Sequence, residues 1–276
     1  MPNDDHSPAR LSRRSALSLI AVTAAGGTLI PRQAFAQEAG TGADTAGLLP
    51  GADVCVITPE VTEGPYYFDP ALERQDVTEG RPGVRTQVRL QVVDAQCKPM
   101  AGARVDIWHA DATGIYSGYA NQPGGIDTTG QTFMRGTQMA GENGVAEFTT
   151  VYPGWYRGRT THIHFKVFLD ETNVLTGQLF FPDALSEFIY LNVAPYSDRK
   201  EERDTINSTD GIAAQATRAS FAYVKELADA YLVAMIIGVD PNAGSGGASR
   251  GMGGPPPPPG GPGSGGSRSL VPGVKG

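Results

Sequence analysis

The sequence predicts an all-β protein folded as an antiparallel β-sandwich with long loops. Short segments in which apolar and polar residues alternate recur through the middle of the chain, as at 88–92 and 145–151. A period of two is typical of strands that bury one face. Turn signals rich in Gly, Pro and Asn separate these segments, and the strand-rich part runs from 53 to 241. A single sandwich domain of this length can bury a sizeable core.

The first 36 residues have the features of an export signal that is removed from the mature protein. Residues 12–17 contain two adjacent arginines and resemble a twin-arginine signal, and an apolar run follows at 16–30. The sequence Ala-Phe-Ala at 34–36 supplies a small-x-small cleavage site. The apolar run is too short and too rich in small residues for a stable membrane span, and an uncleaved anchor is the alternative. We therefore expect a periplasmic or secreted protein with no membrane attachment in its mature form.

Two further segments flank the predicted sandwich. Residues 37–52 are small and polar, as in a linker, whereas Gly, Ser and Pro dominate 242–276 and include five consecutive prolines. The tail cannot bury enough apolar surface to offset the entropy of ordering, so it is predicted to be disordered.

The charge balance argues against nucleic acid as a partner. The chain has 22 basic and 29 acidic residues, and cleavage after Ala36 would leave 18 and 27, a net charge of −9. No basic stripe with interleaved aromatic residues is present, and such a stripe is the usual footprint of nucleic-acid binding.

The strands are expected in a regular succession. In chain order they are 88–92, 104–108, 145–151, 161–169 and 178–181. Lys98-Pro99 separates the first two, the turn at 142–144 precedes the third, and a turn near Thr176 and Gly177 is expected before the last.

Cys55 and Cys97 are the only cysteines of the chain. An oxidising compartment permits a disulfide between them, whereas two free buried thiols are the alternative. The bridge would close a loop of about 42 residues and contribute roughly 3–4 kcal/mol of stability in the chain-entropy treatment. The spacing excludes a CxxC zinc site.

Two histidines lie two residues apart in the expected strand 161–169. His162 and His164 should point to the same face, because successive side chains of a strand alternate between its faces. Such a pair provides two nitrogen ligands for a metal ion. Phe165 and Val167 should point the other way and fill the core.

Three motifs in a fixed order point to a known family. They are Ile107-Trp108-His109-Ala110 with Gly114-Ile115-Tyr116, then Pro153-Gly154-Trp155-Tyr156, then Arg159-Thr160-Thr161-His162-Ile163-His164-Phe165. Together they resemble the intradiol ring-cleavage dioxygenases, such as protocatechuate 3,4-dioxygenase and catechol 1,2-dioxygenase. Residues 58–67, which we call the leading segment, resemble the stretch that opens the family's catalytic domain. The resemblance implies a β-sandwich and a bound iron(III) ion, Fe(3+), with the ligands Tyr116, Tyr156, His162 and His164.

This donor set suits ferric iron chemically. Iron(III) is a hard cation that prefers anionic oxygen and also accepts imidazole. A bound trication lowers the phenol pKa from about 10 until the phenolate forms. Two tyrosinates and one hydroxide neutralise the ion. A catechol dianion that replaces the hydroxide and one tyrosinate keeps the site neutral, and the two displaced bases can accept both catechol protons.

The resemblance also implies roles for individual residues. Tyr156 would be the ligand that is displaced, whereas Tyr116 would stay bound. Arg159 would stabilise negative charge that develops on the ring as dioxygen attacks. Gln178 lies where the family often has a polar residue near the substrate. The implied reaction inserts both atoms of O2 into a catechol-type diol and opens the ring between the two hydroxyl carbons, giving a muconate-type product. The implied partners are therefore a small catechol and O2.

Two other functions remain open on the sequence. A zinc hydrolase or hydratase would use His109, His162 and His164 with a water molecule, but it would leave both tyrosines and Arg159 without a role. A non-catalytic exported sandwich that binds a surface is the other alternative. We expect His109 to be a structural histidine near the site.

The region 213–239 gives conflicting signals. Its content of Ala, Leu, Lys and Glu favours a helix by local propensity. The family resemblance implies two strands instead, near 221–227 and 231–239, and we expect strands.

Overall fold

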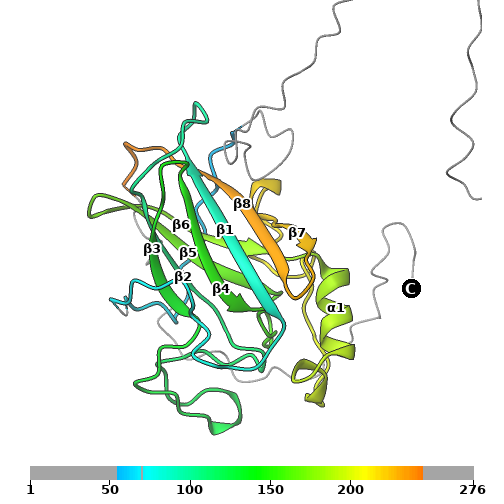
Figure 1. Ribbon diagram of the computed structural model, residues 1–276. Helices are drawn as coiled ribbons and strands as arrows, with labels where there is room; N and C mark the ends of the chain where they lie inside the picture. Colours follow the sequence, from blue (N-terminus) through cyan, green and yellow to red (C-terminus); the bar gives the residue numbers. More distant parts are fainter. Residues whose placement is uncertain (1–54, 70, 245–276) are drawn as a thin grey trace, which may run out of the picture. The chain divides into compact units, whose positions relative to one another are not determined.

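Two four-stranded sheets, packed face to face, carry the fold of the computed structural model (Figure 1). The structure describes residues 55–69 and 71–244. The predicted signal at 1–36, the linker at 37–52 and the tail beyond 244 lie outside these residues. Within the described part of the chain, none of the helices has the length and apolar character needed to cross a bilayer.

The first sheet has the strand order β4-β1-β8-β7. Its strands are β1 (Arg85–Val93), β4 (Val145–Val151), β7 (Tyr223–Glu226) and β8 (Tyr231–Gly238). β1 pairs antiparallel with β4 and parallel with β8, and β7 pairs antiparallel with β8. The late region therefore forms two strands, as the family resemblance implied, and the helix favoured by local propensity does not form.

The second sheet has the strand order β3-β2-β5-β6 and is antiparallel throughout. Its strands are β2 (Arg104–Trp108), β3 (Arg135–Met139), β5 (His162–Leu169) and β6 (Thr172–Phe180). The all-β sandwich predicted from the sequence is confirmed. β3 was not anticipated, because its sequence Arg-Gly-Thr-Gln-Met has no apolar alternation.

The core between the sheets follows from the alternation of side chains along each strand. Ile163, Phe165 and Val167 of β5 are fully buried in it, together with residues of β1 and β8. Because neighbouring side chains point to opposite faces, His162 and His164 must lie on the outer face of the second sheet. The two candidate ligands thus lie on the face of the second sheet that is turned away from the sandwich core.

The predicted turn at Thr176 and Gly177 is wrong, because both residues lie inside β6. The chain turns instead at Asp170 and Glu171. Gly177 pairs with Phe165 of β5, and a Cβ atom added at Gly177 would lie 2.2 Å from the Phe165 ring. Glycine is required there by close packing of the ring against the backbone, and not by a turn.

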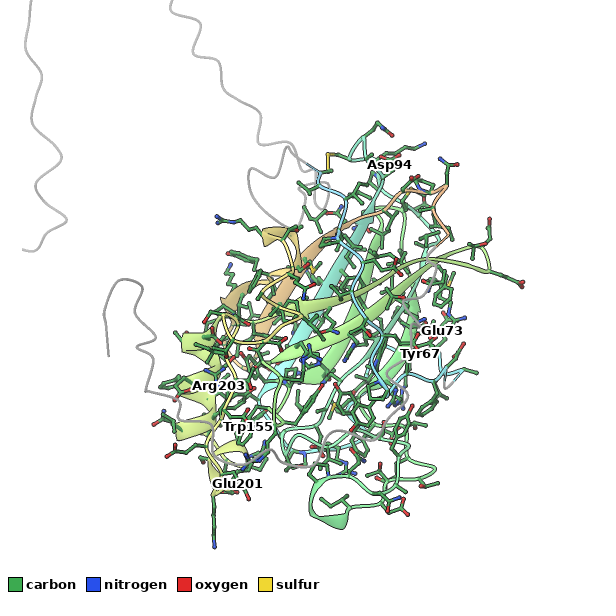
Figure 2. The ribbon with its side chains drawn as sticks, turned by 180° about the vertical axis from the view of Figure 1, so that it is seen from behind. Tyr67, Glu73, Asp94, Trp155, Glu201 and Arg203 are labelled. Atoms are coloured by element: carbon green, nitrogen blue, oxygen red, sulfur yellow. A yellow bond between two sulfur atoms is a disulfide. The ribbon has the colours of Figure 1, made fainter. Side chains whose placement is uncertain are left out.

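One α-helix, α1 (Asp183–Asn192), follows β6 and was not predicted. The described part of the chain also contains three short 3-10 helices: η1 (Pro123–Gly125), η2 (Tyr196–Asp198) and η3 (Arg218–Ser220). Arg203 fastens the loop that follows η2 to α1, since its guanidinium lies 3.3 Å from the carboxylate of Asp183 and 3.2 Å from that of Glu187 (Figure 2).

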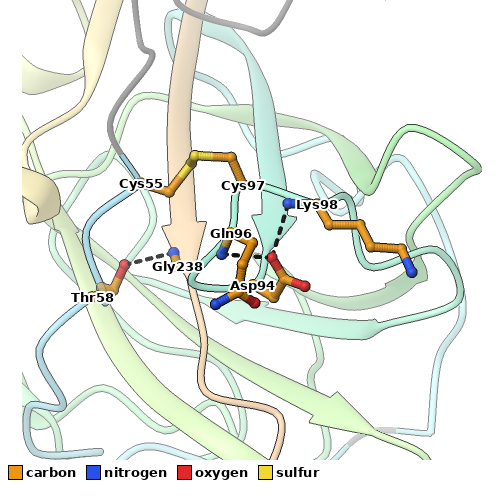
Figure 3. The surroundings of a disulfide bond; sticks show 7 residues. All are labelled: Cys55, Thr58, Asp94, Gln96, Cys97, Lys98 and Gly238. Carbon is orange, nitrogen blue, oxygen red and sulfur yellow. Dashed lines mark hydrogen bonds between the residues drawn. A yellow bond between two sulfur atoms is a disulfide. The ribbon is translucent and has the colours of Figure 1, made fainter.

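The predicted disulfide is present and ties the chain just before the leading segment to the first sheet (Figure 3). Cys55 and Cys97 are 42 residues apart, and their Cα atoms are separated by 5.3 Å. Three residues after Cys55, the Thr58 amide donates to the carbonyl of Gly238 at 2.9 Å, and the Gly238 amide donates to the Thr58 hydroxyl at 3.1 Å. The start of the described chain is therefore held against the ends of β1 and β8.

Replacing both cysteines with serine should lower the free energy of unfolding by about 3–4 kcal/mol, because the unfolded chain loses its cross-link. Denaturant unfolding of the double variant and of the parent measures the difference. Reductant should destabilise the parent by the same amount and leave the variant unchanged. Equal unfolding midpoints for parent and variant would contradict a structural role for the bridge.

Candidate metal centre

The four side chains predicted as ligands come together on the outer face of the second sheet. The Tyr156 Oη atom lies 3.1 Å from the His162 Nε2 atom, and the Tyr116 Oη atom lies 3.4 Å from both of these atoms. The two imidazoles approach through their Nε2 atoms at 3.1 Å. Two phenol oxygens and two imidazole nitrogens thus meet at one point. They come from β5, from the turn before it and from the loop after β2.

Tyr116 is fixed by its own loop. The Gln122 side chain accepts a hydrogen bond from the Tyr116 amide at 2.8 Å and donates one to the Tyr116 carbonyl at 2.6 Å. Gly114 has a φ of +86°, and a Cβ atom there would lie 2.3 Å from the Trp155 carbonyl oxygen. The loop that carries Tyr116 can pack closely against the turn that carries Tyr156 because glycine occupies this position.

The separations between the donor atoms fit a single metal ion. Donors that surround one ion with metal–ligand bonds of about 2 Å lie roughly 3 Å from one another. The observed separations of 3.1–3.4 Å fall in this range. Two phenols and two imidazoles are donors that a hard trivalent ion accepts, since the phenols become anionic on binding.

The hydrogen bond of His162 leaves its Nε2 atom available as a ligand, whereas His164 is held differently. The His162 Nδ1 atom donates to the Thr160 carbonyl at 2.6 Å, which leaves the lone pair on Nε2. His164 stacks on Trp108, with ring centroids 4.8 Å apart and an interplanar angle of 11°. Its buried Nδ1 atom has no hydrogen-bond partner among the described residues. Packing rather than a hydrogen bond sets the orientation of this second imidazole.

Burial determines the protonation states of the four donors. It raises the pKa of Tyr116 well above its ordinary value and also raises the pKa of Tyr156. It lowers the pKa values of His162 and His164 well below the usual histidine value. Without a cation all four side chains are therefore neutral near pH 7. A cation that binds here must expel protons from the phenols, so its affinity should rise with pH.

Arg159 places a permanent positive charge beside the four donors. Its Nη1 atom lies 3.5 Å from the Tyr156 Oη atom and 3.4 Å from the His162 Nε2 atom. Burial alone would lower the pKa of Arg159, but the nearby Tyr156 and Asp210 outweigh this effect and raise it. The arginine thus remains charged at the point where the four donors meet.

Gln178 contacts this arginine. Its side-chain oxygen accepts a hydrogen bond from the Arg159 Nη2 atom, and its side-chain nitrogen donates to the Thr62 carbonyl at 3.0 Å. Gln178 therefore links the arginine to the leading segment. Its predicted contact with substrate stays a prediction.

Two contacts of the site were not anticipated. Tyr66 of the leading segment stacks on Tyr116, with ring centroids 4.3 Å apart and an interplanar angle of 16°. Arg135 of β3 is 1% exposed and donates to the Ser117 hydroxyl and carbonyl, each at 2.8 Å. It contacts no carboxylate among the described residues, and burial lowers its pKa to about 10.

His109 does not join the two other histidines. Its Nδ1 atom contacts the Ala110 carbonyl and its Nε2 atom contacts the Thr150 hydroxyl, each at 2.8 Å. Burial lowers the pKa of His109 to about 4. Over the described residues, no three side chains among His, Cys, Asp and Glu gather in a way that could hold a metal. The three-histidine zinc site therefore does not form, and His109 has the structural role that was expected.

Comparison with known proteins identifies relatives of this chain. The family model described as "Dioxygenase" matches residues 62–194. A catechol 1,2-dioxygenase from Acinetobacter baylyi is 28% identical over 209 residues, which cover 66% of this chain and 64% of that protein. The chain thus spans less than two thirds of the length of this curated relative.

Solved structures extend the similarity over nearly the whole length of two relatives. An intradiol ring-cleavage dioxygenase from Tetranychus urticae is 34% identical with a TM-score of 0.65, and the match covers 70% of this chain and 98% of that one. The dioxygenase domain of a dioxygenase carbohydrate-binding protein fusion from Streptomyces sp. SirexAA-E is 30% identical with a TM-score of 0.51, covering 67% and 99%. On this similarity in sequence and fold, the chain belongs to the intradiol ring-cleavage dioxygenase family.

Proposed function

We propose that this protein is an iron(III)-dependent intradiol dioxygenase that acts on a catechol-type aromatic diol. The observation that carries the proposal is the meeting of two phenol oxygens and two imidazole nitrogens beside the charged Arg159. When bound at this point, iron(III) would chelate the diol and make its ring reactive toward dioxygen. The diol and one O2 would combine, with loss of the bond between the two hydroxyl carbons, to give a muconate-type dicarboxylic acid.

The two tyrosines are held differently, which supports different roles for them. Tyr116 is 2% exposed, clamped by Gln122 on both sides of its peptide and covered by the ring of Tyr66. Tyr156 lies in a short turn and is partly exposed. Tyr156 is therefore better able to move, and its Oη atom is the base that would accept a proton from the incoming diol.

Arg159 and Tyr66 complete the environment of the diol. The guanidinium would stabilise negative charge on the ring and its oxygens as the reaction proceeds, because a fixed cation in a buried site needs no reorganisation. The Tyr66 ring, stacked on Tyr116, covers one side of this donor. Relatives that are catechol 1,2-dioxygenases support a catechol as the class of substrate.

The protein purified from an iron-supplied host should carry one iron per chain and a visible tyrosinate-to-iron absorption band. A screen of catechol, protocatechuate, hydroxyquinol and chlorinated or alkylated catechols should find one that consumes equimolar O2 and yields a muconate-type acid. Stoichiometric zinc in a colourless protein would overturn the proposal. A coloured protein that turns over no diol would leave a binding module.

A further inference from the structure

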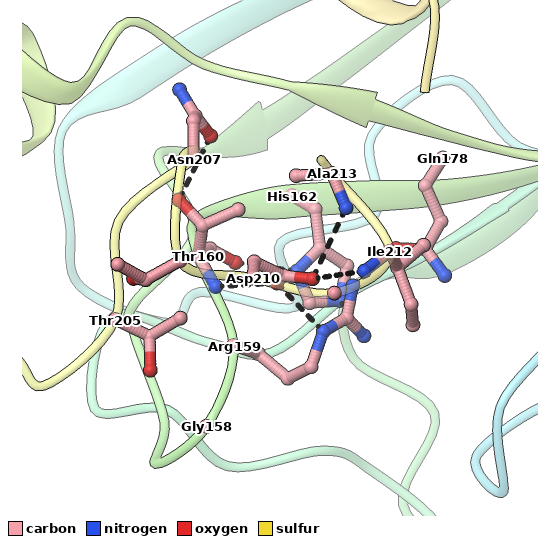
Figure 4. Close-up of polar contacts among 12 residues, drawn as sticks. Gly158, Arg159, Thr160, His162, Gln178, Thr205, Asn207, Asp210, Ile212 and Ala213 are labelled. Carbon is pink, nitrogen blue, oxygen red and sulfur yellow. Dashed lines mark hydrogen bonds and ion pairs between the residues drawn. The ribbon is translucent and has the colours of Figure 1, made fainter. Parts of the chain in front are cut away.

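The carboxylate of Asp210 lies beside the candidate metal centre and contacts both Arg159 and its own turn. It is 1% exposed and accepts four hydrogen bonds (Figure 4). Its Oδ2 atom accepts from the Arg159 Nε atom at 2.9 Å and from the Thr160 amide at 2.8 Å. Its Oδ1 atom accepts from the amides of Ile212 and Ala213 at 2.8 and 3.1 Å. One oxygen therefore faces the site, whereas the other caps the turn that carries Asp210.

The site-facing oxygen reaches two functional side chains. It holds Arg159 directly, and the other two guanidinium nitrogens then face Gln178 and the pair Tyr156 and His162. The same oxygen is linked to His162 through Thr160. The Thr160 amide donates to Asp210, and the Thr160 carbonyl accepts from the His162 Nδ1 atom at 2.6 Å. The carboxylate, the guanidinium and the imidazole thus form one hydrogen-bonded unit.

Loss of either charge of the Arg159–Asp210 ion pair should be destabilising, because the pair is buried. The side chains of Arg159 and Asp210 are 16% and 1% exposed, and removal of one partner of a buried ion pair leaves the other charge uncompensated. Burial tends to raise the pKa of Asp210, but Arg159 and the amides of Thr160 and Ala213 outweigh it and lower the value. The carboxylate is therefore ionised at neutral pH, as the ion pair requires.

The loop around Asp210 has other anchors. The Asn207 amide donates to the Asp183 carboxylate at 3.1 Å, and the Asn207 side-chain oxygen accepts from the Thr160 hydroxyl at 2.9 Å. Arg203 pairs with the same Asp183. A change at Asp210 should therefore leave the loop docked, so that its effect on Arg159 and His162 can be measured separately from loss of the fold.

We infer that Asp210 is a positioning residue, which fixes the direction of the Arg159 guanidinium and, through Thr160, the imidazole of His162. Its importance for turnover rests on the proposed function, whereas its positioning role is a property of the protein itself. Polar partners behind the residues of a metal site typically change activity or metal affinity by about 10–100-fold when they are replaced.

The Asp210→Asn variant tests the positioning role without any turnover. In the full chain stripped of metal, which is diamagnetic, the Arg159 Nε–H proton should exchange with water at least tenfold faster in the variant than in the parent. Asp204→Asn is the matched control, because it makes the same change in the same loop. Asp204 accepts from the Gly158 amide at 3.0 Å and not from Arg159. Unchanged exchange in Asp210→Asn would overturn the inference.

Kinetics of the iron-loaded protein test the consequence for the reaction. Asp210→Asn should lower kcat about 10–100-fold with a small change in KM. The further loss should be smaller when Arg159 is already alanine, because only the route through Thr160 to His162 then remains. Fully additive losses in the double variant would overturn the coupling between the two residues. If the parent turns over no diol, the proposed function fails, and the exchange result still decides the positioning role. Asp210→Ser keeps an oxygen for the turn and repeats both measurements if the asparagine variant does not fold.

Discussion

Arg159→Ala should lower kcat by about a hundredfold or more while the bound iron and its colour persist. Arg159 is not itself a predicted ligand, but its Nη1 atom lies 3.5 Å from the Tyr156 Oη atom. Removal of one preorganised charge-stabilising donor from an active site typically costs about 10²–10³ in rate. Iron analysis, the visible spectrum and steady-state kinetics on one preparation measure the three quantities.

Arg157→Ala is the matched control for this variant. Arg157 lies in the same turn, but its side chain is 69% exposed, and among the described residues its one ion pair is with Asp204, at 3.8 Å. Exposed ion pairs of this kind contribute little, so turnover should stay near that of the parent. If Arg159→Ala cleaved every catechol as fast as the parent, the role assigned to Arg159 would be wrong.

Tyr156→Phe should change the resting spectrum and slow the binding of the diol by at least tenfold. The variant loses an anionic oxygen donor and the base that would accept a diol proton. Tyr119→Phe is a suitable control, because the Tyr119 hydroxyl donates to the Tyr67 carbonyl at 3.0 Å and does not reach the four donors. Stopped-flow mixing with a catechol and the visible spectrum separate the two variants.

The pH dependence of metal affinity gives a second measurement on Tyr156→Phe. Burial raises the pKa of Tyr156, so the metal-free protein holds a protonated phenol that metal binding must deprotonate. The logarithm of iron affinity should therefore rise with pH, and its slope should fall by about one proton in the variant. An unchanged slope together with an unchanged spectrum would show that Tyr156 is not a ligand.

The sequence predicted those parts of the site that have a local pattern. His162 and His164 share a face because they alternate with the core residues Ile163 and Phe165, and this periodicity can be read directly. Tyr116 lies in a separate motif, and only the resemblance to a known family assigned it to the same site as the two histidines. The structure brings these side chains together, and their role as iron ligands stays a prediction.

The supporting residues could not be predicted in the same way. Asp210 lies 51 residues after Arg159 in a loop with no periodicity, so nothing in the sequence ties its carboxylate to the arginine. Arg135 is fully buried although arginine is normally exposed. Gly177 suggested a turn, because glycine is common in turns. The actual reason for a glycine, the Phe165 ring that lies against it, comes from another strand. Each of these depends on contacts between distant parts of the chain.

The leading segment forms one wall of the site without belonging to either sheet. Its Gly64 lies so close to the site that an added Cβ atom would be 3.5 Å from the His164 ring, and Tyr66 covers Tyr116. The segment is held by the disulfide between Cys55 and Cys97, which lies just before it, and by the Val61 amide within it, which donates to the Thr176 carbonyl at 3.0 Å. The donors and the wall thus occupy separate stretches of sequence. The side chains of the leading segment can therefore change, in evolution or by design, without any change in the four donor residues.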